Sequence, residues 1–200
     1  MLTFALAVIL LIVTPGPGVL STAGFGAAYG FKPSLHYVFG LFVGTNLVLL
    51  AVVSGLAAVI VSLPWMRLVL VGVSVAYLLY LAVKIAFAGT KIAFIPAHTP
   101  PGVWGGIALQ AINPKAYAVN TSLMTGFGFA PNNLAFELVA KILIINAIWI
   151  PLHLAWLWAG VALHRLDLPQ HNQRIINIFM ALAMLGVVGL TVWSSFEISK

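Results

Sequence analysis

Two short proline-containing motifs interrupt apolar stretches of this chain. The first is Thr14-Pro15-Gly16-Pro17-Gly18, and the second is Asn113-Pro114-Lys115. Proline lacks a backbone donor and clashes with the preceding helical turn, so each motif predicts a broken helix. In lipid, the backbone groups freed by a break are tolerated only where protein or a water-filled cavity satisfies them. Paired breaks at matching positions of two halves therefore indicate a transporter's binding site, and Pro15 and Pro114 are 99 positions apart.

The first motif predicts a site for an anion. A second half-helix would begin near Pro17, because proline is well tolerated in a first helical turn. Its free N–H groups and the positive end of its dipole would then meet near the middle of the membrane. A substrate carboxylate is the expected ligand. The alternative is a packing kink whose freed carbonyls are satisfied by a neighbouring helix.

The second motif belongs to a polar helix face. At about 100° per residue, one narrow arc holds four polar side chains: Gln110, Asn113, Tyr117 and Asn120. Such a face in a membrane span should point to the bundle interior or a cavity. Lys115 would point almost opposite on a regular helix, but unwinding at Pro114 could bring it to the cavity. Its ammonium would then need a carboxylate, freed carbonyls or substrate as a partner, whereas near the interface it would reach lipid headgroups.

Few residues could relay protons through a membrane span. Glu137 is the only acidic side chain within an expected span, and His153 and His36 are the remaining candidates. Glu137 lies four positions before Lys141, so the alternative for it is a mutually neutralised pair. His153 shares a helix face with Asn146, Trp149 and Trp156, where a lone histidine most often serves as a packing donor.

The composition indicates that these motifs lie in a membrane protein. The chain has 200 residues, of which 62% are hydrophobic and 6% are charged, whereas soluble domains carry about 25% charged residues. At about 20 residues per span, six spans fill the chain, so we expect one transmembrane domain over residues 1–200. The nine Lys and Arg are scattered, which argues against a nucleic-acid partner. There is no cysteine, metal motif, cofactor fingerprint or nucleophile–base set, so we expect neither cofactor nor enzyme activity.

We expect an all-α integral membrane fold with six transmembrane helices, of which the first and fourth are broken by proline. The expected spans cover residues 2–27, 36–62, 66–88, 103–127, 134–163 and 175–196. Three spans per half make the halves, about 1–90 and 103–200, inverted repeats. The connections after the odd-numbered spans hold Lys32, Lys84, Lys91, Arg165 and Arg174, against Arg67 and Lys200 on the other side. This bias predicts cytoplasmic odd-numbered connections and termini outside.

Two pairs of glycines are spaced for close helix packing. They are Gly26-x-x-x-Gly30 and Gly40-x-x-x-Gly44. Small residues at this spacing let helix backbones approach closely in a membrane. The contacts could lie within one monomer or form the seam of a homodimer.

The two proline motifs, with Trp158-x-Gly160 and Asn177, resemble the LysE/RhtB family of bacterial amino-acid exporters over essentially the whole chain. The resemblance implies an inner-membrane secondary transporter that exports small amino acids or their derivatives by proton antiport. The chain departs from the family at Gly18, where members usually carry Asn or Asp. It also reads Tyr117-Ala118-Val119-Asn120 where members are often rich in Phe. The missing side chain at position 18 leaves the substrate open, and Asn120 could compensate for it.

Together, the motifs and the resemblance give a set of expected site residues. The substrate path is expected to involve Pro15, Gly16, Pro17, Gly18, Gln110, Asn113, Pro114, Lys115 and Asn120, with Glu137 and His153 as proton-coupling candidates. The expected partners are a small amino acid, protons, the lipid bilayer and, for a homodimer, a second copy. Two alternatives are an uncoupled facilitator or channel for small solutes and a non-transporting membrane partner subunit.

Overall fold

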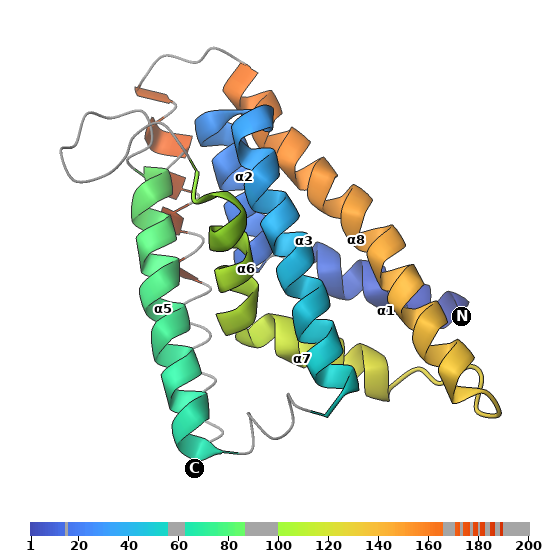
Figure 1. Cartoon of the computed structure of the whole chain (residues 1–200). Coiled ribbons are helices and arrows are strands. Elements are labelled where there is room, and N and C mark those ends of the chain that lie inside the picture. Colours follow the sequence, from blue (N-terminus) through green and yellow to red (C-terminus); the bar gives the residue numbers. More distant parts are fainter. Residues whose placement is uncertain are drawn as a thin grey trace.

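The computed structural model describes residues 1–14, 16–55, 63–86 and 100–165, and from 171 to 189 only residues 171–172, 174–176, 178–179, 181–182, 185–186 and 189. The helices are α1 (Leu2–Val13), α2 (Pro17–Tyr29), α3 (Phe31–Val53), α5 (Pro64–Ala86), α6 (Gly102–Ile112), α7 (Pro114–Thr125) and α8 (Leu134–Arg165), shown in Figure 1. Within these ranges the fold is helical without strands, as predicted. Pro15, Lys91, Asn177, Lys200 and much of the sixth expected span lie outside the described residues.

Both expected helix breaks lie at the proline motifs. The axes of α1 and α2 are bent by 55° relative to each other, and α2 restarts with Pro17 in its first turn and Gly16 as its N-cap. In the second motif, α6 ends at Ile112 and α7 restarts at Pro114, with Asn113 as the N-cap. A proline in a first turn sacrifices no intrahelical hydrogen bond, which explains why each half-helix begins where it does.

Two of the described helices are long and apolar enough to cross a membrane alone. They are α3 and the Leu134–Ala162 part of α8, and α1 with α2 makes a third if the bent pair counts as one span. Large apolar side chains such as Leu2, Leu10 and Leu143 are more than half exposed, as a lipid-facing surface requires. The described residues thus form an apolar helical bundle.

Glycines bring the central helices into close contact within the monomer. A Cβ added to Gly44 would lie 2.8 Å from Gln110 Cβ of α6, and one added to Gly26 would lie 2.6 Å from the Leu157 carbonyl oxygen of α8. Gly40 faces the α6 backbone at Val103 in the same way. These three predicted packing glycines therefore join α3 to α6 and α2 to α8. Gly30 instead has a φ of 78° and ends α2 before α3 begins.

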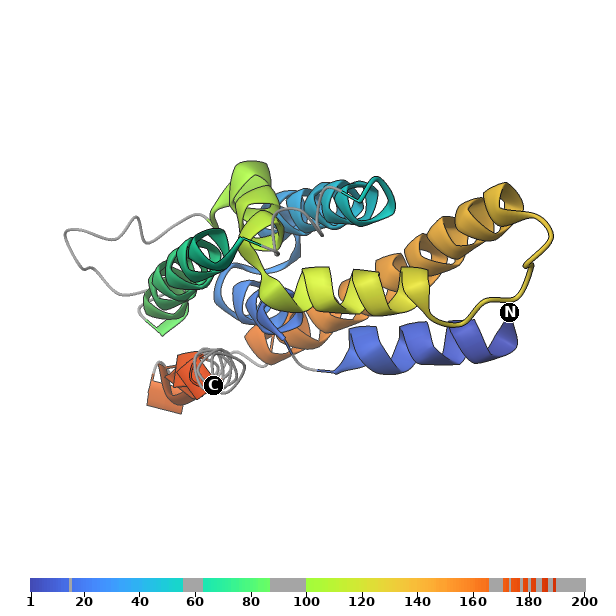
Figure 2. The ribbon, with the colours of Figure 1, turned by 90° about the horizontal axis from the view of Figure 1, so that it is seen from below.

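The core lies where α2, α3, α5 and α8 meet. Phe25, Tyr37, Leu81 and Leu157 are almost completely buried there. The Tyr37 hydroxyl donates to Ser21 Oγ at 2.8 Å and ties α3 to α2. Seen from below, α1 and α7 run side by side beneath this core, with α8 alongside them (Figure 2). The two breaks consequently face each other across the middle of the bundle.

Candidate functional site

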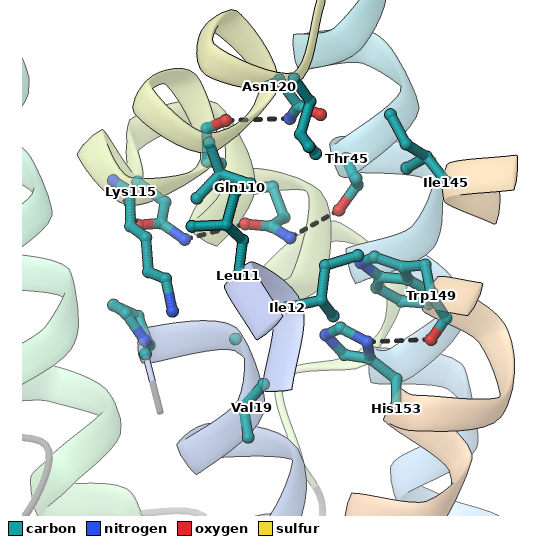
Figure 3. Close-up of a pocket in the computed structure, with 17 residues that line it drawn as sticks. Leu11, Ile12, Val19, Thr45, Gln110, Lys115, Asn120, Ile145, Trp149 and His153 are labelled. Atoms are coloured by element: carbon teal, nitrogen blue, oxygen red, sulfur yellow. Dashed lines mark hydrogen bonds between the residues drawn. The ribbon is translucent and has the colours of Figure 1, made fainter. Parts of the chain in front are cut away.

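A cavity lies between the two helix breaks. Its empty space, part of which is open to solvent, is about 530 Å³, and residues from α1, α2, α3, α6, α7 and α8 line it (Figure 3). The expected site residues that line it are Gly16, Pro17, Gly18, Gln110, Asn113, Lys115 and Asn120. Pro114 forms the first turn of α7 without lining the cavity, and Pro15 lies outside the described residues. Motifs about a hundred positions apart therefore meet at one cavity.

Lys115 joins the two breaks directly. Its Nζ donates a hydrogen bond to the Thr14 carbonyl oxygen across 101 positions of sequence. Its side chain lies over the first motif, because a Cβ added to Gly16 would come within 2.8 Å of Lys115 Cδ. The outward direction expected for a regular helix does not apply, since α7 restarts at Pro114 with its own phase. The ammonium thus faces the cavity and satisfies a carbonyl freed by the first break.

Amide side chains form a chain of hydrogen bonds along one wall. Gln110 Nε2 donates to Thr45 Oγ1 at 2.6 Å, and Asn113 Nδ2 donates to Gln110 Oε1 at 2.9 Å. Asn120 Nδ2 donates to its own helix backbone, at the Ala116 carbonyl oxygen. These contacts fix the orientation of each amide, so the wall presents defined donors and acceptors to the cavity.

Tyr117, the fourth member of the expected polar face, is placed differently. Its hydroxyl donates to the Ala111 carbonyl oxygen at 2.8 Å, and it is not among the residues that line the cavity. The break at Asn113 interrupts the helical phase on which that expectation relied. The expected face therefore describes Gln110, Asn113 and Asn120 correctly and is wrong for Tyr117.

The two half-helix N-termini differ in a way that distinguishes their chemistry. At α7, the Asn113 side chain accepts the Lys115 backbone N–H at 3.1 Å and caps the helix. At α2, the N-cap is Gly16, and no side chain caps the helix. The N–H groups of Gly18 and Val19 belong to the first turn, which has no intrahelical acceptor for them. These groups and the helix dipole make the α2 N-terminus, rather than that of α7, suited to an anion.

His153 and Trp149 form the opposite wall. Their rings stack with centroids 3.6 Å apart and an interplanar angle of 12°, and His153 is only 3% exposed (Figure 3). His153 Nδ1 lies 3.1 Å from the Trp149 carbonyl oxygen. A carbonyl can only accept, so Nδ1 carries the proton and Nε2 of the neutral ring is an acceptor. Nε2 faces the first break, 3.9 Å from where a Cβ on Gly18 would lie.

Glu137 is placed away from the cavity. Its carboxylate pairs with Lys141 Nζ at 2.9 Å and accepts the backbone N–H groups of Phe129 and Ala130. Lys141 in turn donates to the carbonyl oxygens of Met124, in the last turn of α7, and of Gly126, directly after α7. The structure thus has the neutralised pair that the spacing predicts, and the pair holds the α7–α8 connection. Of the expected proton candidates, His153 lines the cavity, whereas Glu137 does not and His36 is exposed.

Reasoning from sequence did not identify nine of the described cavity-lining residues, of which Thr45 and Trp149 carry polar groups. It also missed Asn46, the neighbour of Thr45 in the chain. Asn46 and Asn146 exchange two side-chain hydrogen bonds of 3.0 and 2.9 Å between α3 and α8, at a separation of 100 positions. A signal for Thr45 and Asn46 was present, because they are a polar pair within an otherwise apolar expected span. For Trp149, an indole near a span looks the same whether it packs, anchors or lines a cavity.

A helical membrane bundle with a cavity between two broken helices, whose largely apolar walls carry a few polar groups, has the architecture of a transporter. Comparison with known families agrees, because residues 9–195 match the model of the LysE type translocators, and the chain belongs to this family. It is therefore a member of a transporter family and not of an enzyme family. The resemblance drawn from the two motifs is confirmed.

Curated relatives carry the name "Cysteine/O-acetylserine efflux protein". The chain is 27% identical over 174 residues to the protein of Salmonella paratyphi A, covering 86% of this chain and 87% of that one. It is 28% identical over 157 residues to that of Klebsiella pneumoniae subsp. pneumoniae, covering 78% and 79%. It is 25% identical over 173 residues to that of Escherichia coli strain K12, covering 86% and 87%. No solved structure matches the chain.

Proposed function

We propose that this chain is a bacterial inner-membrane secondary transporter that exports small zwitterionic amino acids or their derivatives from the cytoplasm by proton antiport. The efflux proteins to which it is similar support cysteine, O-acetylserine and compounds of like size as the first substrates to test. The observation that carries the proposal is the uncapped α2 N-terminus, which opens on the cavity beside the Lys115 ammonium.

In the proposed binding mode, the substrate carboxylate accepts the N–H groups of Gly18 and Val19 and lies near Lys115. A charge-assisted hydrogen bond to an ammonium in such a site is stronger than a neutral one. Gln110 and Asn120 face the remaining polar groups of the substrate. Pro15, Gly16 and Pro17 shape the first break, and Asn113 with Pro114 holds the second, so Lys115 stays directed at the cavity.

We further propose the six-span architecture with inverted halves of about 1–90 and 103–200. Two matched features support it: each half has a helix that restarts with proline in its first turn, and Asn46 pairs with Asn146 at 100 positions. In an inverted repeat, α1 corresponds to α6, α2 to α7 and α3 to α8. The α3–α6 and α2–α8 contacts are more extensive than their counterparts α1–α8 and α3–α7. If the α1–α8 and α3–α7 contacts became the close ones and the α3–α6 and α2–α8 contacts became loose, the cavity would open to the other side of the membrane.

Proton coupling is assigned to His153 in preference to Glu137. His153 lines the cavity with an acceptor nitrogen, so protonation there would add a positive charge beside the substrate. Glu137 is already paired with Lys141 outside the cavity. That pairing also favours an uncoupled facilitator as the second candidate, because no carboxylate among the described lining residues can relay a proton. We also propose that both termini lie in the periplasm. A homodimer would need a seam other than Gly26, Gly40 and Gly44, because these glycines pack within the monomer.

The test is efflux from proteoliposomes loaded with O-acetylserine, with a pH gradient imposed across the membrane. We expect protein-dependent efflux that becomes faster when the outside of the proteoliposomes is more acidic than the inside. A His153→Gln variant should lose the acceleration and keep the uncoupled flux. If wild-type efflux does not change with the pH gradient, antiport is wrong and the protein works by facilitated diffusion. If folded protein releases none of a full set of amino acids, amino-acid export is wrong and a partner-subunit role becomes the better reading.

A further inference from the structure

The cavity has an unbalanced set of charges. Among its described lining residues, Lys115 carries the formal positive charge and no side chain is acidic. The whole chain has three Asp and Glu. Glu137 is committed to Lys141 away from the cavity, and Asp167 and Glu197 lie outside the described residues. A second positive charge on a substrate would therefore meet no counter-charge from the described walls.

Gly18 is the position where a counter-charge could be built. A Cβ there would lie 3.8 Å from Gln110 Nε2 and 3.9 Å from His153 Nε2, which is ordinary van der Waals contact. A side chain at position 18 would thus enter the cavity between its two walls. A Cβ at Gly16 would instead lie against the Lys115 side chain, which would have to shift. Position 18 is also in the first turn of α2, where Asp and Asn are well accommodated.

We infer that Gly18 sets the charge selectivity of the cavity. The inference rests on the proposed function and specifies it further. With no side chain at position 18, the cavity accepts a carboxylate compound whose side chain is uncharged, and it rejects basic amino acids. The substrate's ammonium is received by neutral acceptors, such as the oxygens of the amide wall and His153 Nε2, and by no carboxylate.

The expected discrimination is large. Placing an extra ammonium in the middle of a membrane protein without a partner costs enough to lower binding on the order of a hundredfold. A carboxylate at position 18 would weaken binding of the uncharged substrate and strengthen binding of a basic one. It would occupy the α2 N-terminus in competition with the substrate carboxylate, and it would give a basic side chain a partner.

The experiment compares O-acetylserine with lysine, which has the same number of non-hydrogen atoms but an extra positive charge. Proteoliposomes are loaded with both at equal concentration, and the efflux ratio is measured for the wild type, Gly18→Asp and Gly18→Asn. The asparagine variant has nearly the same shape as the aspartate variant and controls for bulk. Gln110→Glu, which introduces a carboxylate from the other wall, serves if Gly18→Asp does not fold.

We expect the wild type to prefer O-acetylserine by on the order of a hundredfold. Gly18→Asp, or Gln110→Glu in its place, should reduce that ratio about tenfold or more, whereas Gly18→Asn should change it by less than about threefold. Comparable export of lysine by the wild type would overturn the inference, as would equal ratios for Gly18→Asp and Gly18→Asn. Either result leaves amino-acid export intact. Export of neither compound by folded wild-type protein would contradict the proposed function itself.

Discussion

The amide pair between α3 and α8 gives a sharp prediction about how these two helices are held together. Asn46 and Asn146 exchange hydrogen bonds of 3.0 and 2.9 Å, and each also donates to its own helix. Inter-helix hydrogen bonds in membranes contribute about 0.6 kcal/mol on average and up to about 1.7 kcal/mol. Replacing either residue by leucine removes both bonds and leaves the other amide without its partner. We expect each single variant to lose about 1–3 kcal/mol of unfolding free energy.

The double variant should cost little more than either single one, because leucines at both positions leave no unpaired amide. The coupling energy of the double-mutant cycle should then be about 1–2 kcal/mol. Unfolding in mixed micelles, followed by tryptophan fluorescence, measures it. Asn46→Leu combined with Gly72→Ala is the control, since Gly72 has no neighbour within 4 Å of an added Cβ. Strict additivity of Asn46→Leu and Asn146→Leu would refute the contact between α3 and α8.

Three further predictions concern packing, the site and the ion pair. Gly160→Ala should destabilise the protein by about 1–3 kcal/mol, because its Cβ would lie 2.9 Å from the Ala23 backbone carbon of α2. Gly72→Ala, where an added Cβ meets nothing within 4 Å, should stabilise the protein by about 0.5–1 kcal/mol. Thermal unfolding compares the two variants, and equal effects would contradict the close packing at Gly160. Lys115→Met should lower O-acetylserine efflux about tenfold or more at normal membrane abundance, and unchanged efflux would remove the ammonium from the site. Glu137→Gln should lower the melting temperature, because the Glu137–Lys141 pair holds the α7–α8 connection. The response of efflux to a pH gradient should stay intact, since the pair lies outside the cavity. Loss of that response would show that Glu137, and not His153, couples transport to protons.

Much of the local architecture could be predicted from sequence because proline and glycine act locally. Pro17 and Pro114 determine where the half-helices restart, and the first and fourth expected spans are broken there. The spacing of Glu137 and Lys141 likewise predicts their ion pair, because residues four apart are neighbours on any helix.

The assembly of the site was harder to predict because it depends on contacts far apart in sequence. The side chain of Lys115 points to the cavity because α7 starts a new helical phase at Pro114. Extending the periodicity of α6 across the break places Lys115 on the wrong side. Its partner is the Thr14 backbone carbonyl, and every residue has a backbone carbonyl, so the residue type gives no sign of this contact. Asn46 and Asn146 are each recognisable as polar residues in apolar spans, but which partner each finds depends on how α3 and α8 pack. Sequence therefore identified 8 of the 17 described residues that line the cavity, and tertiary packing decided their partners.

The most direct test of the central claim is an experimental structure of the protein with O-acetylserine bound. The account predicts that the ligand carboxylate lies within hydrogen-bond distance of the Gly18 and Val19 N–H groups and beside Lys115 Nζ, between the two helix breaks. A ligand bound elsewhere, or bound in this cavity with its carboxylate turned away from the α2 N-terminus, would contradict it.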